Sequence, residues 1–588
     1  MKGFSFGLLL FISYSAFSQW NSDSLTRNIV CNAARNQFYA RSCSDGSGGA
    51  IFTWVDERAP NPLAAVYAQR ITRTGKMAWP ANGIVVYDPA LAGGTGADNS
   101  AIVADGFGGA IIVYEMAVNG GARQLYAQHI NAGGTALWPN AVKITDLVDS
   151  RLDWIGDPEQ DGISPDGSGG AFITWQAYNS PVFIYAQHIN ASGNLVWGST
   201  GVGLPLLAQF DGYRSTIQNT GAGTAVVGFS SLGGGSFYME RLAANGSYMW
   251  GSSGLLVSDI YVNQNYEPAH RIIYDSASSA IMTAFLTQGI LNTSNADLTI
   301  QKIDLNGNFT WKAGGINITK LTGNNNIIKT PDILTDSKGG IFIAYDSNYR
   351  AKVQHINSKG KPMWGTSGIT IDNLASSSQY NPTIVSDGGT GFIVTYNTTR
   401  SWAPGNYPIY GQHYSAAGTA LWQANGVAVI ANYAIINHEV PYTIASTKGY
   451  AITCWSDERN LGSSGSDIYA ARFGGATGLL PPFAPIAINA DANNIANTSK
   501  NSILQLQVYP NPVKNTAHLS FAFPTAESNI VITLFDNVAN KVTTAFLGNM
   551  AAGKHGYDLN IAGLSAGVYQ LRLKGANTLM QTKIVVIK

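Results

Sequence analysis

An internal repeat constrains the fold of this chain more than any other feature. One unit recurs eight times, and each copy begins with a glycine-rich turn such as Asp45-Gly46-Ser47-Gly48-Gly49. Six residues after the fourth turn position stands an aromatic residue, in the eight copies Trp54, Tyr114, Trp175, Phe229, Phe285, Tyr345, Tyr396 and Trp455. Ten residues after a Gln or its equivalent stands a tryptophan, in seven copies Trp79, Trp138, Trp197, Trp250, Trp311, Trp364 and Trp422.

The repeat predicts four short antiparallel strands per copy. Asp-Gly between apolar runs is a hairpin signal, because glycine accepts the positive φ that tight turns need. Units of four antiparallel strands repeated around an axis define a β-propeller, in which the periodic aromatics pack between blades. We therefore expect an all-β fold with an eight-bladed propeller over residues 19–473, seven blades being the alternative, and the repeat tryptophan in each fourth strand.

The eighth copy is incomplete, and this indicates how the ring closes. It has Trp455 and a third strand but no tryptophan after it. Trp20 lies 28 residues before Gly48, inside the range that separates every other repeat tryptophan from the next turn. We expect the N-terminal strand to complete the last blade, which would protect an otherwise open strand edge.

The first 18 residues have the features of a secretory signal peptide. Lys2 is followed by the apolar run 4–12 and by the small residues Ala16 and Ser18. This run is too short to cross a membrane, and no other segment is apolar enough, so we expect no transmembrane span.

Composition excludes two classes of partner and a disulfide framework. Lys+Arg and Asp+Glu both number 35, so the chain has no net field that would attract nucleic acid or an anionic membrane. Three cysteines are too few for a disulfide scaffold in a chain of 588 residues. We expect buried thiols, with a Cys31–Cys43 disulfide as the alternative.

The connections between second and third strands, and those between blades, vary in length and meet on one face of a propeller. Variable loops on a rigid scaffold are typical of recognition, so this variable-loop face is the predicted ligand-binding face. One long connection supplies Asp153, Trp154 and Asp157, and another supplies Trp402 and Tyr407. The aromatics could stack on a sugar and the carboxylates could bind calcium; the alternative is that both loops are solvated and cap their blades.

Trp54-Val55-Asp56-Glu57-Arg58 recurs as Trp455-Ser456-Asp457-Glu458-Arg459, at the same face. Asp56 and Asp457 could serve as general acid and base, or each could pin its loop through hydrogen bonds to the arginine. Recurrence at equivalent places favours the structural alternative, because a catalytic pair is asymmetric. We identify no catalytic residue, no cofactor other than the calcium alternative, and no other metal ligand.

Four histidines follow the repeat Gln in four different copies. Because they would be spread around a ring, they cannot meet at a metal ion, and we expect them on blade surfaces. They are His129, His188, His355 and His413.

Beyond Phe473 the repeat stops. Residues 474–503 are rich in Ala, Asn, Pro and Gly and are typical of a linker. Alternating strands resume over residues 504–588 and suggest a small β-sandwich.

Three ordered motifs mark this last segment: Tyr509-Pro510-Asn511-Pro512, then Gly563 to Gly567, Val568 and Tyr569, then Lys583 to Lys588 at the end. Together they resemble the type A C-terminal sorting domain of the type IX secretion system. The resemblance implies a Bacteroidetes-like bacterium, the type IX secretion machinery as a partner, export across the outer membrane, and removal of this domain during export.

The sequence therefore predicts a secreted or cell-surface protein. Its function is predicted to be binding, adhesion or a structural role, with an unidentified glycan or protein as extracellular ligand. The alternative is a polysaccharide-active enzyme whose site lies on the variable-loop face.

Overall fold

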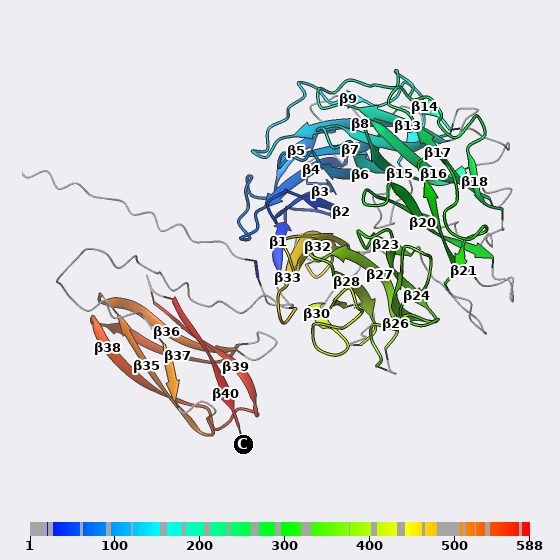
Figure 1. Cartoon of the computed structure of the whole chain (residues 1–588). Coiled ribbons are helices and arrows are strands. Elements are labelled where there is room, and N and C mark those ends of the chain that lie inside the picture. Colours follow the sequence, from blue (N-terminus) through cyan, green and yellow to red (C-terminus); the bar gives the residue numbers. More distant parts are fainter. Residues whose placement is uncertain are drawn as a thin grey trace, which may run out of the picture. The chain divides into compact units, whose positions relative to one another are not determined.

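A computed structural model describes the chain from residue 20 to residue 587 (Figure 1). The segments that lie outside the described residues are 22–26, 59–62, 90–95, 119–121, 153–161, 179–183, 205–211, 232–235, 260–269, 289–295, 319–330, 375–376, 401–407, 432–440, 461–464, 479–505, 510–512, 524, 536–540 and 576–578. Every named element is a β-strand, as the sequence predicts. The chain divides into two compact units, 1–484 and 485–588.

Within the described residues the first unit contains eight antiparallel sheets, here numbered 1 to 8 along the chain. Sheets 1 to 4 consist of β2 (Gln37–Ser44), β3 (Ala50–Asp56), β4 (Ala65–Ile71) and β5 (Ile84–Tyr87); β6 (Ala97–Ala104), β7 (Ala110–Ala117), β8 (Arg123–Ile130) and β9 (Val142–Lys143); β10 (Ser150–Arg151), β11 (Ile163–Pro165), β12 (Ala171–Ala177), β13 (Ile184–Ile189) and β14 (Val202–Gly203); and β15 (Gly212–Gly221), β16 (Thr224–Ser231), β17 (Ser236–Leu242) and β18 (Leu255–Ser258).

Sheets 5 to 8 continue the same order. They consist of β19 (His270–Asp275), β20 (Ala280–Gln288), β21 (Ala296–Asp304) and β22 (Ile316–Asn317); β23 (Asp332–Thr335), β24 (Ile341–Ser347), β25 (Arg350–Ile356) and β26 (Ile369–Thr370); β27 (Gln379–Ser386), β28 (Phe392–Thr398), β29 (Ile409–Tyr414) and β30 (Val427–Ile430); and β31 (Tyr442–Ala445), β32 (Tyr450–Asp457) and β33 (Asp467–Gly474), to which β1 (Asn28–Cys31) is added.

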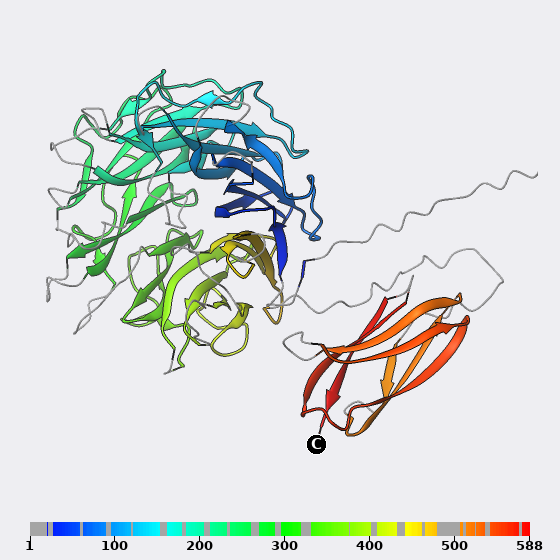
Figure 2. The same ribbon diagram turned by 180° about the vertical axis from the view of Figure 1, so that it is seen from behind.

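The sheets follow one another around a common centre (Figure 2). Their first strands make a continuous series of neighbour contacts, β2 with β6, β6 with β11, and so on to β27 with β31. β31 in turn contacts β2. The N-terminal strand β1 pairs antiparallel with β33, with Ile29 opposite Tyr469.

The core lies between neighbouring sheets. Second strands such as β3, β12, β24 and β28 are buried along their whole length, because each is covered by a sheet on both sides. One cluster joins Ile51 and Trp79 of sheet 1 to Ile102 and Tyr114 of sheet 2. The repeat aromatics thus pack between sheets, as predicted.

The placement of the repeat tryptophan in the fourth strand was wrong. Trp79 precedes β5, which begins only after Gly83 turns the chain at φ 85°. The indole instead points to the next sheet, where its Nε1–H donates to the carbonyl oxygen of Ala132 at 3.2 Å. The same bond runs from Trp138 to Ala191 at 2.9 Å.

The prediction that four histidines lie on blade surfaces was also wrong. His129 and His188 are only 4% and 9% exposed. The Nε2 of His129 lies 3.0 Å from a carboxylate oxygen of Asp105, the first residue of the turn in its own sheet. His129 and His188 are buried, and His355 and His413 half-buried, because the turn aspartate of each sheet, which also accepts turn N–H groups, supplies a partner.

All three cysteines are free and buried, so the alternative of a Cys31–Cys43 disulfide is wrong. The second unit has two antiparallel sheets around one core. The first consists of β34 (Gln507–Tyr509), β35 (Thr516–Phe523) and β38 (Gly553–Asn560); the second of β37 (Lys541–Met550), β36 (Glu527–Phe535), β39 (Gly567–Lys574) and β40 (Leu579–Val586).

Candidate functional site

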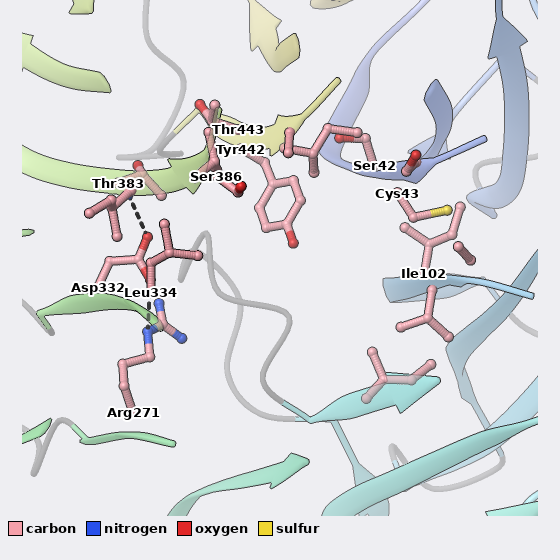
Figure 3. Close-up of a pocket in the computed structure, with 18 of the residues that line it drawn as sticks. Ser42, Cys43, Ile102, Arg271, Asp332, Leu334, Thr383, Ser386, Tyr442 and Thr443 are labelled. Atoms are coloured by element: carbon pink, nitrogen blue, oxygen red, sulfur yellow. Dashed lines mark hydrogen bonds and ion pairs between the residues drawn. The ribbon is translucent and has the colours of Figure 1, made fainter. Parts of the chain in front are cut away.

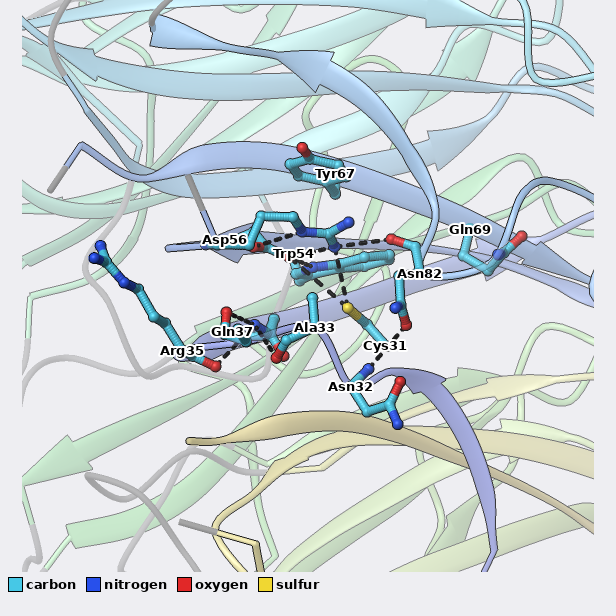
Figure 4. Close-up of polar contacts among 12 residues, drawn as sticks. Cys31, Asn32, Ala33, Arg35, Gln37, Trp54, Asp56, Tyr67, Gln69 and Asn82 are labelled. Carbon is cyan, nitrogen blue, oxygen red and sulfur yellow. Dashed lines mark hydrogen bonds and ion pairs between the residues drawn. The ribbon is translucent and has the colours of Figure 1, made fainter. Parts of the chain in front are cut away.

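Asp56 is the last residue of β3, and its carboxylate is enclosed by donors (Figure 4). It accepts hydrogen bonds from Trp54 Nε1 at 2.7 Å, from the Arg58 backbone N–H at 2.9 Å and from Arg58 Nε at 2.9 Å. The Arg58 guanidinium lies 3.7 Å from the ring centre of Tyr67. Asp56 is 0% exposed, so its charge is compensated wholly by these neighbours.

The same cluster reaches the N-terminal strand. Arg58 Nη2 donates to the carbonyl oxygen of Asn82 at 2.8 Å and lies 3.1 Å from the sulfur of Cys31, the last residue of β1. The Asn32 N–H donates to Asn82 Oδ1 at 3.1 Å. Burial raises the pKa of Cys31 to about 12, so the thiol stays protonated. The cluster therefore joins β1 of sheet 8 to sheet 1.

Asp457 repeats this arrangement in sheet 8. It accepts hydrogen bonds from Trp455 Nε1 at 2.9 Å and from the Arg459 backbone N–H at 2.9 Å, and it too is 0% exposed. The Arg459 guanidinium lies 4.5 Å from the ring centre of Tyr469. Of the two interpretations of these aspartates, the geometry matches the one in which arginine pins the loop.

Sheet 7 holds a third copy that the sequence did not reveal. Arg400 lies 2.6 Å from the carboxylate of Asp372 and 4.2 Å from the ring centre of Tyr410. In this copy the carboxylate belongs to Asp372, which follows the last strand of sheet 6. Sheet 7 therefore lacks the Trp-x-Asp pattern that contains Asp56 and Asp457 in sheets 1 and 8. The usable signal is the arginine four residues after the repeat aromatic, at positions 58, 400 and 459.

Asp153, Trp154, Asp157, Trp402 and Tyr407 lie outside the described residues. Among the described residues no group of three His, Cys, Asp or Glu side chains could hold a metal ion.

The base of the 153–161 connection is nevertheless defined. Asp149 Oδ1 accepts hydrogen bonds from Arg151 Nε at 3.0 Å and Nη2 at 2.9 Å. The guanidinium of Arg151 lies 4.6 Å from the ring centre of Tyr178, which follows β12. An ion pair and a stacked ring therefore fix the chain where this acidic connection leaves sheet 3.

Glu115, near the end of β7, is a buried acid that the sequence did not single out. It is 4% exposed, and burial raises its pKa to about 8, with Asp98 raising it further and Arg123 lowering it. Its carboxyl group is therefore largely protonated at neutral pH and can donate a proton or a hydrogen bond.

A central cavity of about 520 Å³ is lined by the first strands of all eight sheets (Figure 3). Arg271 Nε from β19 faces Asp332 Oδ1 from β23 at 3.9 Å, and Asp332 Oδ2 accepts the Ile384 N–H at 2.8 Å. Burial raises the pKa of Asp332 and of Tyr442, which points into the same space from β31. Sequence reasoning missed these residues because their convergence depends on the ring.

The sorting motifs converge in the second unit. The Val513 N–H, just after the first motif, donates to the Val585 carbonyl at 2.8 Å, and the Ile587 N–H donates back to Val513 at 2.8 Å. Tyr569 Oη donates to the Ser565 carbonyl at 2.9 Å.

The other motif residues fall into two groups. Tyr509 lies in β34, Gly567 begins β39, and Lys583 pairs with Gln570 across β39 and β40. Pro510, Asn511, Pro512 and Lys588 lie outside the described residues.

These elements define an all-β protein with a C-terminal unit that carries the three motifs of an export signal. Residues 507–588 match the Secretion system C-terminal sorting domain, which confirms the predicted resemblance to the type IX secretion family. This domain indicates export to the cell surface or secretion and implies an interaction with the secretion machinery. In the described part of the chain no helix is long and apolar enough to cross a membrane.

Several solved structures are similar over most of the chain. A protein of unknown function from Dyadobacter fermentans is 10% identical, covers 76% of this chain and 96% of its own, and has a TM-score of 0.31. The β-propeller domain of the Trilobed protease from Pyrococcus furiosus is 9% identical, with coverages of 67% and 100% and a TM-score of 0.35. PorZ of the type IX secretion system of Porphyromonas gingivalis is 8% identical, with coverages of 96% and 82% and a TM-score of 0.28. A comparison with curated proteins finds no match.

Proposed function

We propose that the exported chain is a binding protein whose first unit is an eight-bladed β-propeller, closed by the N-terminal strand. The ligand is an extracellular glycan or protein bound at the variable-loop face. Residues 1–18 act as signal peptide and residues 474–503 as the linker to the sorting domain. Closure is supported by the β1–β33 pairing and by the contact of β31 with β2.

One observation carries the proposal: connections between second and third strands differ greatly in length, and in sheets 1, 7 and 8 an arginine and a buried carboxylate fix their base. In sheet 6 only Asn348 and Tyr349, with φ of 53° and 60°, join β24 to β25. In sheet 7 the connection runs from Thr398 to Ile409, and Arg400 is held at its base by Asp372. Fixed bases below variable loops are the arrangement by which a rigid scaffold presents recognition residues.

Trp154, Trp402 and Tyr407 are the proposed stacking residues, with Asp153 and Asp157 as polar contacts. A glycan array and surface-protein panel with the mature chain would identify a ligand. Trp154→Ala and Trp402→Ala should each weaken its binding about tenfold or more, as for aromatic anchors generally. Leu137→Ala, on the opposite end of sheet 2, is the control and should leave affinity unchanged. If all three variants bound the ligand with the same affinity, the variable-loop face would not be the binding site.

A further inference from the structure

The first-to-second and third-to-fourth hairpin turns of the eight sheets lie at one end of the first unit, here called the turn face. Contacts between neighbouring sheets establish this. Ser446 Oγ, in the first turn of sheet 8, donates to the Gly48 carbonyl in the first turn of sheet 1 at 2.6 Å. Trp422 Nε1 likewise donates to the Gly475 carbonyl in the next sheet at 2.8 Å.

Positive charge is concentrated on this face, although the chain as a whole has a formal net charge of zero. Six exposed basic side chains stand in the turns of sheets 1, 6 and 8: Arg73, Lys76, Lys338, Lys359, Lys361 and Lys448. Sheets 6, 7, 8 and 1 are consecutive, so these residues form a basic arc.

Acidic side chains in the same turns are enclosed by their own sheets. The turn aspartates accept turn N–H groups and a side-chain contact, as Asp45 does from Arg70 at 3.0 Å and Asp387 from the imidazole of His413 at 2.9 Å. Asp304 is half-buried and accepts the N–H groups of Asn306 and Asn308. The six basic side chains are therefore not cancelled locally.

Sheet 8 adds a further cation. Its first turn has Ser446 where five other sheets have aspartate, so Arg472 bonds the hydroxyls of Ser446 at 3.2 Å and Thr447 at 2.7 Å. Burial and the nearby Arg73 lower the pKa of Arg472, while Tyr450 opposes them. The neighbourhood of Arg73 and Arg472 thus holds like charges side by side.

Apolar side chains are exposed on the same face. Phe107, at the tip of the first turn of sheet 2, is 76% exposed. The residue before the repeat tryptophan, next to the third-to-fourth turn, is exposed in several sheets: Leu137, Val196, Met249, Met363 and Leu421. Basic and apolar side chains at one surface are the combination that binds the interface of an anionic membrane.

We propose that the turn face docks on an anionic lipid surface. Lysine and arginine side chains contact phosphate headgroups, and Phe107, Leu137 and Leu421 enter the interface between headgroups and acyl chains. A soluble polyanion would use the charges but would leave the apolar side chains in water. Docking in this way would point the variable-loop connections away from the membrane. The proposal does not depend on a ligand at those connections.

The test is co-sedimentation of the full mature chain with vesicles. We expect binding to vesicles of phosphatidylcholine with about one-third phosphatidylglycerol, none to pure phosphatidylcholine, and weaker binding as salt rises. Each basic residue near such a surface contributes roughly fivefold, so the triple variant Lys338→Glu, Lys359→Glu, Lys361→Glu should lower the partition coefficient about a hundredfold. Arg35→Glu, Lys143→Glu, Lys352→Glu makes the same change of net charge in the first unit but outside its hairpin turns, and it should bind as the wild type does.

Absence of wild-type binding to the anionic vesicles would overturn the proposal, as would equal loss in the two triple variants. Leu137→Ser combined with Leu421→Ser tests insertion and should weaken vesicle binding several-fold while leaving retention on heparin unchanged. If the double variant lost vesicle binding and heparin retention to the same extent, insertion of these side chains into the membrane interface would be excluded. Displacement from vesicles by millimolar inorganic phosphate beyond its effect on ionic strength would indicate a free-phosphate site instead of a lipid surface.

Discussion

The indole N–H of Trp20 donates to the carbonyl oxygen of Thr72 at 3.1 Å. In sheets 1 and 2 the repeat tryptophans Trp79 and Trp138 make the same bond to the next sheet. Trp20 is 2% exposed, although it lies at the extreme of the described chain. It thus supplies to sheet 8 the tryptophan that the eighth repeat lacks.

Replacing this tryptophan should destabilise the first unit. Trp20→Ala removes a buried aromatic and a hydrogen bond, for an expected loss of about 3–5 kcal/mol in the free energy of unfolding. Urea unfolding followed by tryptophan fluorescence measures it. Trp138→Ala, within a sheet that is continuous in sequence, is the matched variant and should lose a similar amount. A loss below about 1 kcal/mol for Trp20→Ala alone would show that the N-terminal segment does not fasten sheet 8.

Breaking the Asp56 cluster should also be costly. Arg58→Ala leaves a wholly buried carboxylate without its charged partner, and removing one member of a buried pair costs roughly 3–5 kcal/mol. Lys143→Ala removes a salt bridge to Asp146 in which both side chains are well exposed, and it should change stability by less than about 1 kcal/mol. Chemical denaturation compares the two. Equal small losses would mean that Arg58 does not pin its loop.

The raised pKa of Glu115 should lower the free energy of unfolding of the protein as pH rises. Its folded pKa, about 8, lies above the ordinary value of 4.5, so the folded state holds more protons than the unfolded state between these values. The stability of Glu115→Gln relative to the wild type should therefore increase from pH 4.5 to pH 8, by at most roughly 5 kcal/mol. Unfolding at a series of pH values gives the difference, in which the other titrating groups cancel. A difference that does not vary with pH would contradict the assignment.

The thiols should be unreactive in the folded protein. Burial raises the pKa of Cys31 to about 12 and raises that of Cys43 further, so neither forms the reactive thiolate at pH 8. A thiol-specific chromogenic reagent should label no cysteine in native buffer and all three in denaturant. Fast labelling of the native protein would show that the junction between β1 and sheet 1 opens.

The sorting domain should act on a foreign passenger. Residues 504–588 fused to a periplasmic reporter should direct it outside a cell that has type IX secretion. Removal of residues 583–588 should retain the reporter in the periplasm, because it deletes most of the chain end that pairs with Val513. Cell fractionation distinguishes the outcomes. Export of the truncated fusion would show that the terminal strand is dispensable.

The sequence was informative where a side chain repeats at a fixed spacing. Glycines of the turns and the aromatics of second strands recur because every sheet meets the same packing problem, so strand order and burial could be predicted from Trp54 and its equivalents. Side-chain direction was harder to predict. The four histidines were expected on the surface because nothing local shows that a turn aspartate faces each ring, and Trp79 turns toward another sheet instead of continuing a strand.

Convergence of residues distant in the chain was not predictable. Arg271, Asp332 and Tyr442 line one cavity only because first strands from different sheets meet at the centre. Asp372 pairs with Arg400 across a sheet boundary, so no sequence pattern links them. The basic arc escaped notice for the same reason, since a balanced composition says nothing about where charges gather.

The pairing of Ile29 with Tyr469 joins positions 440 residues apart. A chain that leaves the cytoplasm amino end first therefore carries β1 across without a partner, and β1 stays unmatched until β33 has followed it. The pairing of β1 with β33 can therefore form only late in transport, so the first unit cannot complete its fold while most of the chain is still crossing. A truncated product that ends before residue 467 would lack β33, so β1 would have no strand to pair with. Its open strand edge would be exposed to proteases and to other copies of the chain.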